Sequence, residues 1–324
     1  MKNGTKIALA IGIILLAVGA TIVNIAVGRG DKADFSFGTK DGSVFSGFSV
    51  GKGVDQKGYT VCTDGEESFR TSEVRKLDLD WVSGTVTVEA YDGGELIVRE
   101  KIDGSATEQQ RMRWRLSGGE LSVLPCADNL TDLPTKHLTV LVPKTMEAEW
   151  LNVDVSSAKV TIDGLSLSGE IDVDSASGRV EISNCVCREL FIDSASGAQS
   201  VTDCVVDGLV ESDSASGSFE AIGLSCGALD VDGASGAVRA EDLLCGGSVD
   251  IDSGSGLVYL SFGAAPKSVN VDTASGAVTL VFPKGTGIDL NYDSASGKLS
   301  GELSAGKLSV DVDTVSGDLR IEYR

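Results

Sequence analysis

One block of sequence, with the pattern V-D-S-A-S-G, recurs nine times between residues 151 and 324. Self-similarity at a fixed period of about 20 residues indicates a repeat architecture in which each copy is one supersecondary unit. No other feature of the chain constrains its fold as strongly. The aspartate of the block marks each copy, at steps of 19 to 21 residues: Asp154, Asp174, Asp193, Asp213, Asp232, Asp252, Asp272, Asp293 and Asp313.

Each copy predicts two short strands joined by a bend. Before the marker, apolar residues stand two apart with a polar residue between them, as in Leu229, Asp230 and Val231, which is the period of a strand with one buried face. A second alternation with the opposite parity follows, so we expect a bend between the two. The bend falls on the repeated Ser-Gly pair: Ser177, Gly178, Ser196, Gly197, Ser216, Gly217, Ser235, Gly236, Ser255, Gly256, Ser275, Gly276, Ser296, Gly297, Ser316 and Gly317.

A coil of this length cannot bury its own apolar face and must stack on its neighbours. The sequence therefore predicts an all-β fold, a single β-solenoid whose rungs lie about 4.8 Å apart. The alternative is an antiparallel meander folded into a sandwich. The near-constant spacing favours the solenoid, because hairpins would alternate two inequivalent strands.

Residues 7–28 carry no charge, and at about 1.5 Å per residue such a helix spans the hydrocarbon core of a bilayer. The sequence thus predicts a transmembrane anchor over 1–30 with a short cytoplasmic N-terminus. Lys2 and Lys6 precede the apolar run, which favours the N-terminus inside and the rest of the chain outside a bacterial cell membrane. A cleaved signal peptide ending at Val18-Gly19-Ala20 is the alternative.

Three further segments follow the anchor. Residues 31–72 are rich in Gly, Ser and Asp and predict a flexible stalk. Residues 73–150 contain apolar runs without the regular period, and we expect irregular rungs that cap the solenoid. The regular repeats occupy 151–324.

The net charge of −21 argues against a nucleic-acid partner, because binding phosphates requires clustered Lys and Arg. Residues 151–324 hold 27 acidic and 10 basic side chains, a net charge of −17, so most of the charge belongs to the repeats. Stacked carboxylates about 4.8 Å apart repel by roughly 1 kcal/mol per pair even in water. Turn hydrogen bonds, interspersed Asn residues or a divalent cation would offset this repulsion.

Calcium is the cation that suits these oxygen ligands, and no other cofactor is expected. Against it, the Gly-rich nonapeptide repeat of calcium-binding β-rolls is absent. Ordinary solvated acidic faces are the simpler interpretation. The candidate calcium ligands are Asp172, Asp174, Asp230, Asp232, Asp250 and Asp252.

A Ser with an Asp three residues earlier invites comparison with a hydrolase. However, His137 is the only histidine, it precedes the repeats, and nine equivalent copies do not make one catalytic site. We therefore predict no catalytic residues and no enzymatic activity. The repeated Ser hydroxyls are instead expected to form an inward hydrogen-bonded ladder at the bend.

Five of the seven cysteines recur in phase with the repeat and should stack. Counted from the preceding marker, Cys185 and Cys204 lie at position +11, whereas Cys187, Cys226 and Cys245 lie at +13. Three interpretations remain open. The cysteines are small apolar core residues, they form disulfides between adjacent rungs, or Cys185, Cys187 and Cys204 belong to a metal site. Cys62 and Cys126 precede the repeats, and an odd total leaves at least one thiol without an intrachain disulfide partner.

The order of features resembles the bacterial "putative adhesin" family of β-strand repeats, a family of unknown function. Four segments carry the resemblance, together with the nine Ser-Gly coils, over about residues 73–324: Lys76-Leu77-Asp78-Leu79, Ser83-Gly84-Thr85-Val86, Gly119-Glu120-Leu121-Ser122-Val123 and Leu138-Thr139-Val140-Leu141-Val142-Pro143. The resemblance implies a right-handed solenoid, often tethered to a membrane and exposed at the bacterial surface. It supplies no catalytic residues.

These observations predict a non-enzymatic, membrane-anchored surface module for adhesion or scaffolding. The alternative is an envelope-sensing or regulatory partner of another membrane protein. A calcium-dependent glycan binder is less favoured, because the three Trp residues all precede the regular repeats and leave no aromatic platform there.

Overall fold

The computed structural model describes residues 56–127 and 133–324. The predicted membrane helix at 7–28 lies outside these residues, as do residues 31–55 of the predicted stalk. The rest of the predicted stalk, 56–72, contains strands at Thr60–Val61 and Glu66–Arg70. Within the described part, no helix is both long and apolar enough to cross a bilayer. The described residues form two compact units, 56–180 and 181–324.

Both units are all-β, as the alternating pattern predicted, and two short 3-10 turns are the other regular elements of the described chain. The first unit contains β1 (Thr60–Val61), β2 (Glu66–Arg70), η1 (Thr71–Glu73), β3 (Lys76–Trp81), β4 (Gly84–Tyr91), β5 (Glu95–Ile102), η2 (Glu108–Gln110), β6 (Arg113–Ser117), β7 (Glu120–Leu124), β8 (Lys136–Pro143), β9 (Ala148–Val155), β10 (Lys159–Asp163) and β11 (Leu167–Ser175). Strand β12 (Val180–Ser183) begins at the boundary between the units.

In the first unit the spatial order of the coils differs from their order in the sequence. Strand β3 pairs in parallel with β7 on one side and with β9 on the other. Strand β4 likewise pairs with β8 and β10. The coil β3–β4 therefore lies between two coils that both follow it in the chain. Antiparallel strands continue the pairing beyond β7 and β8, because β6 pairs with β7 and β5 with β8.

The second unit consists of parallel strands. Its elements are β13 (Val186–Cys187), β14 (Glu189–Ser194), β15 (Gln199–Thr202), β16 (Val205–Ser214), β17 (Phe219–Ile222), β18 (Ser225–Gly233), β19 (Val238–Cys245), β20 (Ser248–Ser253), β21 (Val258–Phe262), β22 (Ser268–Thr273), β23 (Val278–Phe282), β24 (Ile288–Ser294), β25 (Leu299–Gly301), β26 (Leu308–Thr314) and β27 (Leu319–Tyr323).

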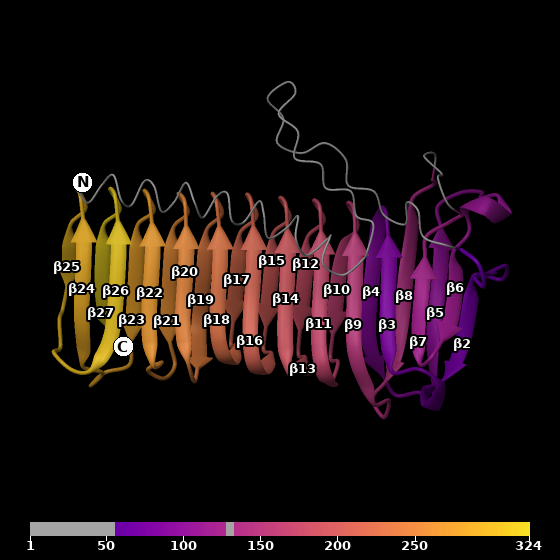
Figure 1. Cartoon of the computed structure of the whole chain (residues 1–324), viewed down its shortest axis with the longest axis horizontal. Helices are drawn as coiled ribbons and strands as arrows, with labels where there is room; N and C mark the ends of the chain where they lie inside the picture. Colours follow the sequence, from indigo (N-terminus) through magenta and orange to yellow (C-terminus); the bar gives the residue numbers. More distant parts are fainter. Residues whose placement is uncertain (1–55, 128–132) are drawn as a thin grey trace, which may run out of the picture. The chain divides into compact units, whose positions relative to one another are not determined.

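Each coil of the second unit contributes one strand to each of two sheets (Figure 1). The first sheet runs β14-β16-β18-β20-β22-β26-β24 and the second β15-β17-β19-β21-β23-β27-β25. Every one of these neighbours is parallel, with a register shift in β16–β18 and in β19–β21, so the antiparallel meander considered from sequence is wrong for this unit.

The last coil of the chain lies inside the stack. Strand β26 pairs with both β22 and β24, and β27 pairs with both β23 and β25. The coil β24–β25 therefore forms the outer edge of the second unit (Figure 1). Its residues are correspondingly more exposed, and Leu299 is 41% exposed where its counterpart Leu319 is fully buried.

The core of the second unit lies between the two sheets. Residues at the apolar positions predicted from sequence are fully buried, as at Leu229, Val249 and Ile251. Each such side chain contributes roughly 1.5–3 kcal/mol when it leaves water. Phe262 and Phe282 stack between neighbouring coils with ring centroids 5.1 Å apart. Stacking of the coils thus buries the apolar face that a single coil would leave exposed.

Candidate functional site

The marker aspartates of the second unit form one column along the first sheet. Register pairs join consecutive coils without a gap, and this marker column comprises Asp193, Asp213, Asp232, Asp252, Asp272, Asp313 and Asp293 in spatial order. Two residues earlier on the same strands, a second column contains Glu211, Asp230, Asp250, Asn270, Asp311 and Asn291. Since side chains two apart share a face, both columns lie on the same face of the sheet. These two columns form the acidic face of the second unit.

Burial and mutual repulsion raise the pKa of carboxyls in the marker column. Desolvation is the larger cause and raises the pKa of Asp213, Asp232 and Asp252 to about 7, with neighbouring carboxylates adding to the shift. Asp213 is only 4% exposed. One oxygen of Asp252, Oδ1, is buried without a hydrogen-bond partner. Near neutral pH the column is therefore partly protonated, which relieves part of its own repulsion.

The second column contains hydrogen bonds that reduce the repulsion between its carboxylates. The amide of Asn291 donates a hydrogen bond to Asp311 at 3.0 Å, and the hydroxyl of Ser309 donates another at 3.1 Å. In the first unit, the amide of Asn152 donates to Asp78 and to Asp154, each at 3.0 Å. Interspersed Asn residues thus offset carboxylate repulsion, as the sequence suggested.

The candidate calcium ligands fall into both units. Asp172 and Asp174 lie on β11 of the first unit, and Asp172 is 2% exposed. In the second unit Asp230 is the register partner of Asp250, and Asp232 is that of Asp252. Even so, no three or more His, Cys, Asp or Glu side chains among the described residues are placed to hold a metal ion. Calcium binding at these aspartates therefore stays a prediction.

The eight repeated serines of the Ser-Gly pairs are exposed, contrary to the expected inward ladder. Their hydroxyls donate, where bonded, to a backbone carbonyl of the neighbouring coil, as Ser177 does to Ser156 O at 3.3 Å and Ser235 to Ala215 O at 3.4 Å. The prediction was wrong because the bend turns this position toward solvent.

The inward hydroxyls belong to the residue directly after each marker. Ser194, Ser214, Ser253 and Thr273 are buried, and each accepts a hydrogen bond from the amide of the repeat Gly three residues on, at 2.6–3.1 Å. Sequence reasoning missed this role. The signal was present, because Ser or Thr occupies this position in most copies.

Close approach of the backbone, rather than an unusual φ, explains the repeat glycines. A Cβ added at Gly256 would lie 1.7 Å from Gly236 O, and one added at Gly276 would lie 1.8 Å from Gly256 O. The carbonyl of one coil occupies the space where the side chain of the next would project. Glycine at this bend is therefore a requirement of stacking.

The cysteines of the repeats stack as their phase predicted. Cys226 and Cys245 are register partners on β18 and β19. Cys187 on β13 faces Val206 on β16. All seven cysteines of the chain carry thiols rather than disulfides.

The first unit places the one histidine in a row of polar side chains. His137 Nδ1 lies 3.0 Å from Thr85 Oγ1, and His137 Nε2 lies 3.2 Å from Asp103 Oδ2. Sequence reasoning did not anticipate these contacts, which depend on the pairing of β4 with β8. The side chains of His137 and Asp103 are 27% and 54% exposed.

The row has a hydroxyl, an imidazole and a carboxylate in sequence, which is the order of a hydrolase triad. None of its members lines the described cavity of this unit. A substrate would also need donors aimed at the developing oxyanion. The half-exposed Asp103 carboxylate favours a hydrogen-bonded surface row.

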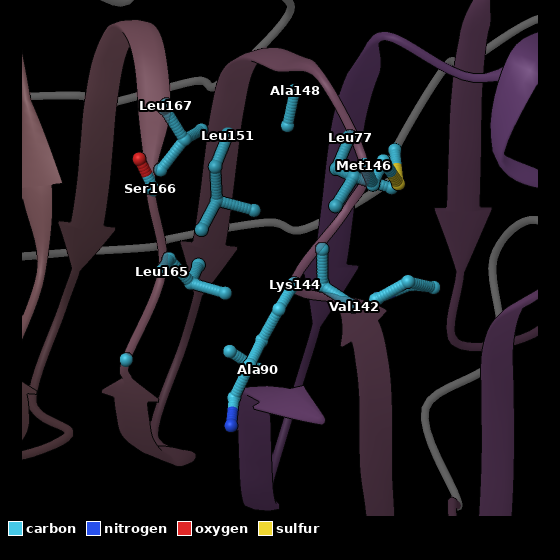
Figure 2. Close-up of a pocket in the computed structure, with 12 residues that line it drawn as sticks. Leu77, Ala90, Val142, Lys144, Met146, Ala148, Leu151, Leu165, Ser166 and Leu167 are labelled. Atoms are coloured by element: carbon cyan, nitrogen blue, oxygen red, sulfur yellow. The ribbon is translucent and has the colours of Figure 1, made fainter. Parts of the chain in front are cut away.

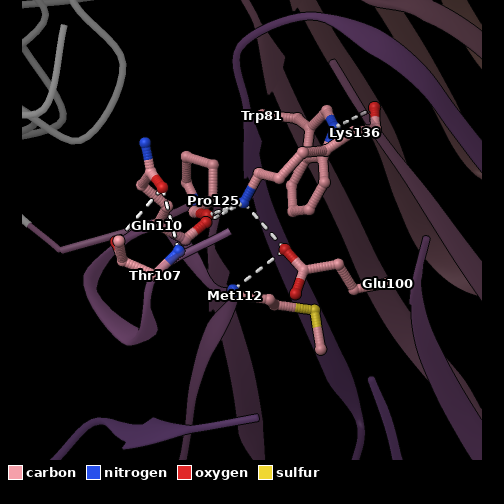
Figure 3. Close-up of polar contacts among 7 residues, drawn as sticks. All are labelled: Trp81, Glu100, Thr107, Gln110, Met112, Pro125 and Lys136. Carbon is pink, nitrogen blue, oxygen red and sulfur yellow. Dashed lines mark hydrogen bonds and ion pairs between the residues drawn. The ribbon is translucent and has the colours of Figure 1, made fainter. Parts of the chain in front are cut away.

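A buried ion pair connects β5 and β8 of the first unit (Figure 3). Lys136 Nζ donates to Glu100 Oε1 at 2.7 Å and to Gln110 O at 2.8 Å, and it also donates to Pro125 O. The side chains of Lys136 and Glu100 are 3% and 0% exposed. Burial lowers the pKa of Lys136, while Glu100 opposes that shift.

Trp81 completes this cluster. Its ring centroid lies 4.8 Å from Lys136 Nζ, and its indole N–H donates to Lys136 O at 3.1 Å. The amide of Met112 donates to Glu100 Oε1 at 2.9 Å. Each proton donor named here has an internal partner, so the cluster fixes the packing of this unit, although Glu100 Oε2 is buried without a hydrogen-bond partner.

An apolar cavity of about 140 Å³ lies among β3, β4, β8, β9 and the segment before β11 (Figure 2). Leu77, Val142, Met146, Leu151 and Leu165 supply most of its wall. Ligand pockets are usually about 300–1,000 Å³. The cavity is thus closer in size to a packing defect than to a binding site for a metabolite.

Taken together, the fold and these sites define an all-β repeat protein of stacked parallel coils with an acidic face. The family model Toastrack DUF4097 matches residues 74–322, so the chain belongs to this family, whose function is unknown. Among solved structures, the chain is similar to a "putative cell adhesion protein" from Clostridium sporogenes ATCC 15579. That similarity has 10% sequence identity and a TM-score of 0.21, and covers 80% of this chain and 99% of that one. No curated protein matches the sequence.

Proposed function

We propose that the chain is a non-enzymatic surface module that acts in adhesion or scaffolding, held at a bacterial membrane by residues 7–28 with the coils outside. One observation carries the proposal, namely the repetition of the same side chains at the same register positions along the second unit. Such a surface offers many equivalent contacts and no unique reactive point. We further propose that the coils wind as a right-handed β-solenoid, the hand favoured for parallel crossovers.

Equivalent weak contacts suit a repetitive partner, because each additional contact is made at high effective concentration. The acidic face then selects a cationic surface and repels nucleic acid and anionic lipid headgroups. The Thr85–His137–Asp103 row remains structural in this proposal.

The first test is the side of the membrane. Ser235 is exposed, so Ser235→Cys should react with a membrane-impermeant maleimide on intact cells that express the full chain. The unsubstituted chain is the control, since its repeat cysteines are buried and its partly exposed Cys126 sets the background labelling. Labelling that appears only after lysis would refute the proposed topology.

The second test is adhesion itself. Cells that express the full chain should be retained on a polycationic or matrix-coated surface, and the double substitution Asp230→Asn and Asp250→Asn should reduce that retention. Asp242→Asn is a matched control outside both acidic columns. If residues 1–30 are replaced by a cleavable signal peptide and the secreted protein does not bind the surface, the result would instead support a membrane protein partner and an envelope-sensing role.

A further inference from the structure

Two pairs of buried thiols in the second unit stand apart from the other cysteines, because each pair joins neighbouring coils. Cys226 on β18 and Cys245, the last residue of β19, are register partners in parallel strands. They are 6% and 3% exposed, and their thiols are hydrogen-bonded to one another. Adjacent strands lie about 4.8 Å apart, which falls within the 4.4–6.8 Å usual between the Cα atoms of a disulfide.

The second pair lies just before two paired strands, because Cys185 precedes β13 and Cys204 precedes β16. The amide of Val205 donates to Cys185 O at 2.9 Å, which aligns Cys204 with Cys185. The thiols of Cys185 and Cys204 are also within hydrogen-bond reach of each other. Both residues are 1% exposed.

Cys187 provides an internal contrast. It is equally buried, at 2%, and it lies only two residues from Cys185. Its register partner is Val206, so it faces a methyl-bearing side chain where the others face a thiol. Cys187 therefore resembles Cys185 in burial and in position along the chain, and differs from it in the residue that it faces on the neighbouring coil.

We propose that Cys226 with Cys245 and Cys185 with Cys204 are two oxidisable pairs, each of which closes a disulfide between neighbouring coils, whereas Cys187 remains a thiol. The oxidant is a small-molecule disulfide. This assignment leaves Cys187, Cys62 and Cys126 outside the bridges and so accounts for the odd number of cysteines.

The step is a thiol–disulfide exchange. The Cys245 thiolate attacks one sulfur of the oxidant and expels the other as a thiolate, which forms a mixed disulfide. Cys226 then loses its proton and attacks the Cys245 sulfur, which expels the second thiolate. Two electrons pass from the two cysteines to the oxidant, whose sulfurs both end as thiols after protonation.

The environment of Cys245 favours it as the attacking group. The hydrogen bond from the Cys226 thiol lowers the pKa of Cys245 to about 7, and the same contact raises the pKa of Cys226. Cys245 also ends its strand at a corner of the coil, beside Gly246 and Gly247, and the preceding Leu244 is 48% exposed. Opening of this corner exposes the thiol without separating the sheets.

The test is to incubate the full-length reduced chain with excess oxidised glutathione at pH 8, block remaining thiols with N-ethylmaleimide, and map the peptides by mass spectrometry. We expect Cys226 bridged to Cys245, Cys185 bridged to Cys204, and Cys187 carrying the maleimide. Each bridge should remove two hydrogen atoms from the mass and be reversed by dithiothreitol.

Two variants sharpen the result. Cys187→Ser should leave both bridges intact. Cys226→Ser should leave Cys245 alkylated or glutathionylated and the other bridge unchanged, and Cys226→Ala serves the same purpose if the serine variant loses its β-type circular dichroism. The proposal is overturned if the folded wild-type chain yields only alkylated or stable glutathionylated cysteines, or if Cys187 enters a bridge. It is equally overturned if the two bridges form only in urea.

Discussion

The buried carboxyl of Asp213 should make the second unit less stable as the pH rises. Its pKa is raised from 3.8 to about 7 in the folded chain, chiefly by desolvation. Between these two values the unfolded chain has released its proton and the folded chain has retained it. The free energy of unfolding therefore falls as pH rises from about 4 to about 7, and it is constant above the folded pKa.

The size of the effect follows from the pKa difference. A shift of about 3 pH units at 1.36 kcal/mol per unit corresponds to an upper bound of about 4 kcal/mol for this one group. Because the effective dielectric constant of buried sites is near 20 and neighbouring carboxyls share the protons, we expect roughly half of that. Asp213→Asn removes the charge and keeps the shape, so it should stabilise the chain by about 2 kcal/mol at pH 8 and by close to zero at pH 4.

Urea unfolding of both proteins, followed by circular dichroism at the two pH values, measures this difference. Asp207→Asn is the matched control, because Asp207 lies on the same strand, is exposed, and should change stability by less than about 0.5 kcal/mol at either pH. Equal stability of Asp213→Asn and the wild type at pH 8 would refute the argument that desolvation of this column costs stability. Equal gains at both pH values would refute the role of charge.

Three further perturbations test other parts of the structure. Gly256→Ala places a methyl group on Gly236 O and should destabilise the chain by about 3 kcal/mol or more in urea unfolding; a change below 1 kcal/mol would contradict the stacking role of the glycine. Glu100→Gln leaves the Lys136 ammonium buried without a counter-charge and should lower the free energy of unfolding by about 3–5 kcal/mol in urea unfolding at pH 8. A stability equal to that of the wild type would contradict this role of the ion pair. The wild type should hydrolyse p-nitrophenyl acetate without saturation, and a saturable rate that is lost in both His137→Ala and Thr85→Ala would show that the surface row is catalytic.

The sequence alone determined the local design of the coils. The positions of Leu229 and Val231 around Asp230 predict a strand with one buried face, and the structure confirms that alternation. The phase of Cys226 and Cys245 predicts their stacking, which also holds. These features depend on residues close together in the sequence or on a constant repeat period, so they can be predicted from the sequence alone.

The tertiary structure decided the order of the coils and the reason for their glycines. Strand β26 lies between β22 and β24, and no sequence period distinguishes this order from simple succession. The repeat Gly, as at Gly256, is required by the carbonyl of an adjacent coil. The contact between Thr85 and His137 likewise exists only because β4 pairs with β8. In each case the contact joins two segments that are distant in the sequence. It exists only once the coils have stacked.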